Sequence, residues 1–141
     1  RESTRIDGMG HVFSQVTYNI ARWPTLLNVP QQDVESILGD YPAGLSQTAM
    51  SDVWMDSPLN QILDFYEHLS ADDPPLWTEN EAPAATVVDD SNVLLHLPRG
   101  HTTLYDRCVA VGMDCSVRNQ ARDQGRSGDV IQFLADVLLA P

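Results

Sequence analysis

Lysine is absent from this chain of 141 residues, and all eight of its basic residues are arginines. Residues 23–98 contain no basic residue except histidine, although they hold nine Asp and four Glu. Without lysine, Schiff-base chemistry and phosphate-binding loops of the Gly-Lys type are excluded. The formal net charge is −12, which opposes binding to nucleic-acid phosphates and to anionic membrane surfaces. We therefore expect neither a direct nucleic-acid contact nor a membrane contact.

Long apolar runs are also missing, since no segment approaches the roughly 18 apolar residues of a membrane-spanning helix. Cysteine is scarce: Cys108 and Cys115 are the only two. With His96 and His101 they could supply two nitrogen and two sulfur ligands, but structural zinc sites use closely paired ligands, typically Cys-x2–4-Cys. The sequence therefore predicts two separate thiols, no metal and no cofactor, and leaves a Cys108–Cys115 disulfide as an alternative.

Motifs for nucleophilic catalysis are weak. Ser127 lies in Gly-Arg-Ser-Gly-Asp, whereas an exposed nucleophile turn needs Gly-x-Ser-x-Gly after a strand. We interpret Ser127 as the cap of a helix. Pairs of acids such as Asp72-Asp73 are expected in loops, where water keeps carboxylates ionised and unsuited to acid–base work.

Helical periodicity and helix start and stop signals account for most of the chain. Residues 1–10 are polar and predict a flexible lead-in. Pro24 is expected to end a first helix, because the residue before a proline is displaced from helical geometry. The ranges expected to be helical are 11–23, 30–39, 58–69, 102–111 and a last helix capped by Ser127, and the short segment 45–55 and the polar segment 116–124 are candidates for one more.

Two segments depart from this helical pattern. Residues 70–85 contain three prolines and four acids, which predict an acidic, proline-rich loop with Trp77 exposed. Residues 86–97 predict two short strands joined by a turn. The sequence thus indicates a single α+β domain over residues 1–141, mainly α with five to six short helices and a small β-hairpin.

The function expected from these patterns is non-enzymatic protein–protein interaction or assembly. An acidic surface with aromatic anchors suits a basic partner or a neighbouring subunit, as in a viral particle or a host-directed effector. The predicted partner-binding residues are Trp54, Asp56, Asp64, Glu67, Asp72, Asp73, Trp77, Glu79 and Glu81.

Two alternatives remain open at this point. The first is a nucleic-acid mimic, which displays carboxylates at phosphate-like spacing on one continuous face and thereby inhibits a nucleic-acid-binding protein. The second is a small hydrolase or transferase domain that brings together dispersed His, Asp and Cys residues. Its candidate histidines are His11, His68, His96 and His101.

Overall fold

A four-stranded mixed sheet forms the centre of the molecule. The computed structural model describes residues 7–12, 19–39, 64–83, 87–89 and 91–139. Strands β1 (Met9–Val12), β2 (Leu76–Asn80) and β3 (Cys115–Asn119) run parallel, and β4 (Arg122–Gln124) pairs antiparallel with β3. The strand order is β1-β2-β3-β4, so β2 and β3 each have a neighbour on both sides.

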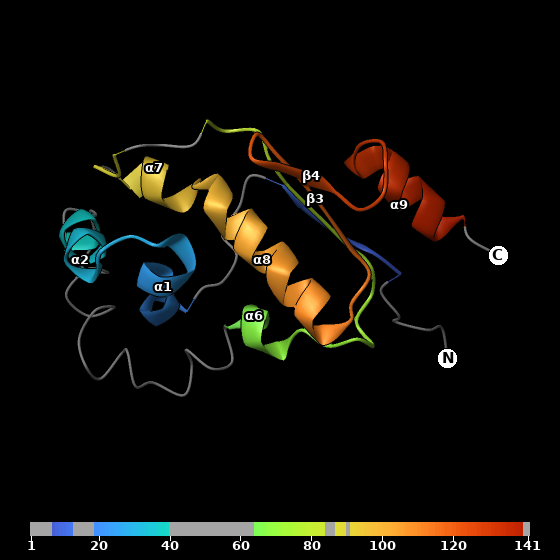
Figure 1. The fold of residues 1–141 in the computed structure, drawn as a ribbon, viewed down its shortest axis with the longest axis horizontal. Coiled ribbons are helices and arrows are strands. Elements are labelled where there is room, and N and C mark those ends of the chain that lie inside the picture. Colours follow the sequence, from blue (N-terminus) through green and yellow to red (C-terminus); the bar gives the residue numbers. More distant parts are fainter. Residues whose placement is uncertain (1–6, 13–18, 40–63, 84–86, 90, 140–141) are drawn as a thin grey trace.

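Helices cover both faces of this sheet (Figure 1). Helix α8 (Pro98–Val111) lies on one face and α9 (Val130–Leu138) on the other. Successive side chains of a strand point to opposite faces, and β2 follows this rule. Thr78 contacts His101 of α8, whereas the ring of Trp77 lies 5.8 Å from that of Phe133 of α9.

The main core lies between the sheet and α8. Strand residues Leu76 and Cys115 pack there against Leu104 and Cys108 of α8, and Leu104 and Cys108 are fully buried. Full burial of an aliphatic side chain of this size contributes about 1.5–3 kcal/mol. Helix α8 ends at Gly112, whose φ of 80° is a left-handed conformation that glycine adopts without strain.

A second core lies among the helices near the N-terminal end of α8. Helix α1 (Trp23–Leu27) follows a 3-10 turn, η1 (Ile20–Arg22), and packs against α8. Helix α2 (Gln31–Gly39) packs against α7 (Ser91–Leu95), and a short helix, α6 (Phe65–His68), precedes β2. The buried residues of this second core are Trp23, Leu27, Val29, Val34, Ile37, Leu94 and Leu97.

Helix α9 approaches β1 so closely that β1 needs glycine there. A Cβ atom on Gly10 would lie 2.9 Å from Cγ2 of Val130. The carboxylate of Asp129 accepts a hydrogen bond from the Gln132 amide at 2.8 Å and so caps α9. Ser127 was the expected cap, so that detail of the sequence prediction is wrong, although the helix itself is present.

The predicted fold class, mainly α with a small β-hairpin, is wrong because the centre is a four-stranded sheet. The expected loop at 70–85 contains β2, and the expected helix at 116–124 contains β3 and β4. The expected hairpin at 86–97 is replaced over residues 91–95 by α7. The strands were not recognised in the sequence because several of their buried residues are polar, namely Thr78, Asn80, Ser116 and Asn119.

Other helix predictions have mixed outcomes. The helix at 30–39 is confirmed by α2, and the one at 102–111 lies within α8. Residues 9–12 form a strand, although residues 9 and 10 were expected in the flexible lead-in and residues 11 and 12 in a helix. Pro24 lies in the first turn of α1 and does not end a helix. The expected helix at 45–55 and the range 58–63 lie outside the described residues.

Candidate binding site

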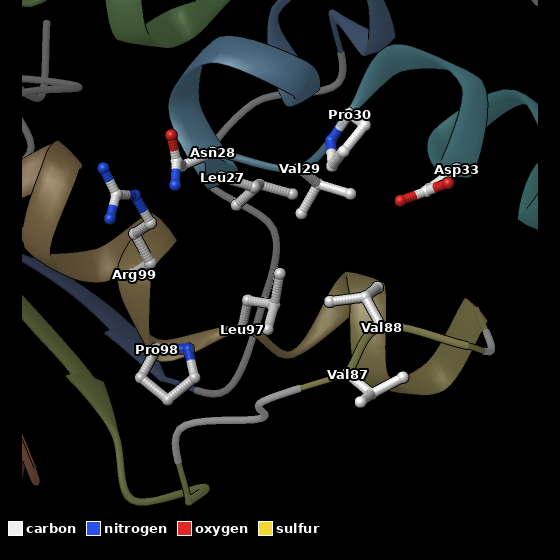
Figure 2. A pocket seen from close by; sticks show the side chains of 10 residues that line it. All are labelled: Leu27, Asn28, Val29, Pro30, Asp33, Val87, Val88, Leu97, Pro98 and Arg99. Atoms are coloured by element: carbon white, nitrogen blue, oxygen red, sulfur yellow. The ribbon is translucent and has the colours of Figure 1, made fainter.

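A cavity of about 510 Å³ opens between the α1–α2 connection and the segment that leads into α8 (Figure 2). Apolar and polar surface contribute similar shares of its walls, and its polar side chains are Asn28, Asp33 and Arg99. Ligand sites in proteins usually have this size and combine apolar side chains with a few polar groups. The lining residues are Leu27, Asn28, Val29, Pro30, Asp33, Val87, Val88, Leu97, Pro98 and Arg99.

Local sequence features build this cavity. Asn28 ends α1 in a left-handed conformation, with φ of 54°, which asparagine tolerates better than most residues. Pro30 then precedes α2, and the amides of Asp33 and Val34 donate to its carbonyl. On the other side, Pro98 begins α8 and its fixed φ suits the first helical turn. Asp33 and Arg99 therefore lie in the first turns of α2 and α8.

Arg99 is the basic group of the cavity. Its side chain is exposed and forms no salt bridge or ring contact with any described residue. Each of the other described arginines has a carboxylate partner: Arg22 with Asp64 and Glu67, Arg107 with Glu67, Arg118 with Asp123, Arg122 with Asp106 and Arg126 with Asp114. The Arg99 guanidinium is thus available to an external anion.

Several of the predicted partner-binding acids have partners inside the fold. Asp64 is 2% exposed and accepts hydrogen bonds from Asn19, at 3.0 Å, and from Arg22. Glu67 forms salt bridges with Arg22 and Arg107. Asp73 accepts a hydrogen bond from the Ser70 amide at 2.7 Å. These carboxylates stabilise the turn and the helices around α6.

Asp72 and Glu81 differ from those acids because both are exposed and neither carboxylate forms a salt bridge or a hydrogen bond with a described residue. Asp89, which was not among the predicted residues, shares both properties. These three are named the open acids below. Trp54 and Asp56 lie outside the described residues.

Trp77 is fully buried, so the exposure predicted for it is wrong. Its ring packs under α9, and the guanidinium carbon of Arg118 lies 5.2 Å from its centroid. Its Nε1 donates a hydrogen bond to Glu79 at 2.8 Å. Trp77 therefore forms part of the contact between the sheet and α9, and Glu79 accepts the hydrogen bond of its indole.

Cys108 and Cys115 form no disulfide, which agrees with the prediction of two separate thiols, and the Cys108 thiol donates a hydrogen bond to Cys115. Both are free and buried. That hydrogen bond, followed by burial, raises the pKa of the Cys108 thiol, and the same hydrogen bond lowers the pKa of Cys115. Within the described ranges, no cluster of three or more His, Cys, Asp or Glu residues could hold a metal ion.

Two of the four histidines meet at the centre of the sheet. Nδ1 of His101 lies 2.6 Å from the Thr78 hydroxyl, and the rings of His11 and His101 are 4.9 Å apart. His101 is 1% exposed, so a substrate could reach it only if α8 moved away from the sheet. His68 is exposed on α6, and the carbonyl of His96 accepts a hydrogen bond from Asn80 at 2.9 Å.

The sequence prediction did not single out Arg99 and Asp33, which line the cavity, or the exposed Asp89. One available signal was Arg99 itself, because it is the arginine that ends the interval 23–98 without Lys or Arg. Comparison of the chain with protein-family models, with curated proteins and with solved structures finds no match. In the part of the chain that the structure describes, no helix is long and apolar enough to cross a bilayer.

Proposed function

We propose that this chain is a non-enzymatic interaction domain whose acidic surface binds a basic protein partner. The observation that carries the proposal is the unequal distribution of ion pairs. Beyond Gly100, three of the five Asp residues, Asp106, Asp114 and Asp123, pair with an arginine from the same part of the chain, and the other two, Asp129 and Asp136, accept hydrogen bonds from Gln132 within α9. The open acids Asp72, Glu81 and Asp89 have no such arginine within the described residues.

Exposed carboxylates without an internal counter-charge attract basic partners and accelerate their association. Carboxylates that already pair with arginine contribute less to this field, because the two charges largely cancel at a distance. The proposal therefore assigns the partner's arginines and lysines to the open acids and not to the acidic residues as a whole.

Two triple variants with the same change in net charge test this assignment. The first, D72N/E81Q/D89N, neutralises the open acids. The matched control, D106N/D114N/D123N, neutralises acids that already have arginine partners, and exposed salt bridges of this kind contribute little to stability. We expect a partner captured from the native lysate by the wild type to be lost with the first variant and kept with the control. Equal loss with both would contradict the proposal, because net charge alone would then explain binding.

Self-assembly through α9 is a second candidate, supported by the exposure of two large apolar side chains. Ile131 and Leu138 are 71% and 67% exposed, and their spacing of seven residues places them on one side of the helix. We expect sedimentation velocity to detect an oligomer that the I131E/L138E variant dissociates. A monomeric wild type at high protein concentration would contradict this second candidate.

A further inference from the structure

The cavity between α1, α2 and the start of α8 combines apolar side chains with two charges of opposite sign. Leu27, Val29, Val88 and Leu97 are among its apolar residues, while Arg99 and Asp33 are its charged residues. Figure 2 draws Arg99 and Asp33 on opposite sides of these apolar side chains. A compound that fills the cavity would therefore meet a cation at one end and an anion at the other.

The Arg99 side chain is suited to binding the carboxylate of a ligand. Its guanidinium forms no salt bridge with the described residues, in contrast to the other five described arginines. A guanidinium presents parallel N–H donors that match the two oxygens of a carboxylate. An anion bound here would gain two charge-assisted hydrogen bonds without breaking an ion pair inside the protein.

Asp33 limits which anions the cavity can take. Its carboxylate is partly buried in the first turn of α2, and it forms no salt bridge with any residue that the structure describes. A simple fatty acid or phosphate ester would satisfy Arg99 but would cover the Asp33 carboxylate without giving it a counter-charge, which is unfavourable. A ligand with an ammonium group at its other end would satisfy both residues.

We propose that this cavity binds a short apolar peptide with free ends. The carboxylate of the peptide pairs with Arg99, its ammonium group pairs with Asp33, and its side chains pack on Leu97 and Val29. A cavity of about 510 Å³ falls within the range of roughly 300–1,000 Å³ that is usual for small ligands. This inference goes beyond the proposed function and does not depend on it, because the open acids Asp72, Glu81 and Asp89 take no part in the proposed peptide contacts.

Isothermal titration calorimetry of the full chain with the tripeptide Leu-Ala-Leu tests the proposal. We expect saturable binding at one site. Amidation of the peptide carboxylate weakens it about tenfold or more, as expected for the loss of hydrogen bonds between charged groups. The R99Q substitution should weaken binding of the free peptide by a similar factor. It should not weaken binding of the amidated peptide further, since both changes remove the same interaction. Acetylation of the peptide and the D33N variant form the equivalent pair at the other end.

Controls separate this result from unfolding and from general charge effects. Arg99 and Asp33 make no salt bridge with described residues, so R99Q and D33N should fold with a wild-type circular dichroism spectrum. R122Q removes an arginine that pairs with Asp106 away from the cavity, and its affinity for the tripeptide should equal that of the wild type. Sodium octanoate, an apolar anion without an ammonium group, should bind at least tenfold more weakly than the tripeptide.

Three results would overturn the proposal. One is the absence of saturable heat with the free tripeptide up to millimolar concentration. Another is an R99Q variant that still distinguishes the free peptide from its amide as strongly as the wild type does. The third is octanoate binding as tight as that of the tripeptide, which would remove the role of Asp33.

Discussion

The indole ring of Trp77 in β2 packs against the phenyl ring of Phe133 in α9, with the ring centroids 5.8 Å apart. Both side chains are fully buried or nearly so. This contact attaches the C-terminal helix to the face of the sheet opposite α8. It also explains how an acidic, proline-flanked segment forms a central strand, because one large aromatic anchor holds that segment under a helix.

Trp77→Ala should therefore destabilise the protein strongly. Removal of a fully buried Trp side chain costs about 3–5 kcal/mol through lost apolar contact and the cavity that remains. Urea denaturation measures the free energy of unfolding. Val109→Ala in α8 is the control, because its exposed side chain should change that free energy by no more than about 0.5 kcal/mol. A Trp77→Ala variant as stable as this control would contradict the structure.

Gly10→Ala should destabilise the protein by steric conflict with α9. The added Cβ atom would lie 2.9 Å from Cγ2 of Val130, and overpacking of this kind typically costs about 1–3 kcal/mol. Val130→Ala removes the conflicting methyl groups, so Gly10→Ala should cost less in the Val130→Ala background. Strictly additive effects in this double-mutant cycle would show that the two residues are not in contact.

Asp64 and Glu67 both pair with Arg22, but the structure assigns them different importance. Asp64→Asn removes a buried charge that Asn19 and Arg22 hydrogen-bond, and we expect a loss of about 1.5–3 kcal/mol. Glu67→Gln removes a half-exposed partner of Arg22, and we expect a loss below about 1 kcal/mol. Thermal unfolding of both variants compares them directly. A larger effect at Glu67 would contradict the assigned burial.

Stability above roughly pH 8.5 should fall because of Cys108. The hydrogen bond with Cys115 and burial raise the pKa of Cys108 in the folded protein, while the unfolded thiol ionises near pH 8.5. Above that pH the folded state retains a proton that the unfolded state has lost, so rising pH favours unfolding, by at most about 1.4 kcal/mol per pH unit. Denaturation between pH 8 and 10 should show this slope in the wild type and not in Cys108→Ala. The same slope in both proteins would contradict the assignment.

Sequence patterns predicted the amphipathic helices well and the sheet poorly, for physical reasons. The helix at residues 30–39 has apolar residues at helical spacing, and Val34 and Ile37 are buried as that spacing requires. Strand β3 has the sequence Cys-Ser-Val-Arg-Asn, which is too polar to be recognised as a buried strand. Its polar residues Ser116 and Asn119 are buried because they accept hydrogen bonds from the amides of Arg126 and Arg122. Such tertiary partners are not visible in a local pattern.

The candidate site could be predicted only in part for a related reason. The excess of acidic charge is a property of composition, and Asp72 and Glu81 are indeed exposed. Which acids are paired depends on contacts between distant residues, as between Arg22 and Asp64. The cavity likewise joins residues 27–33 to residues 87–99, and no spacing rule relates these two segments.

The most direct test of the proposed function is capture of a partner by the wild-type chain from its native lysate at about 50 mM and about 500 mM salt. This range changes the screening of exposed charges strongly. We predict a basic protein that is captured at low salt and released at high salt. Recovery of the chain alone, or of a partner that remains bound at high salt, would contradict the central claim that the open acids form the binding surface.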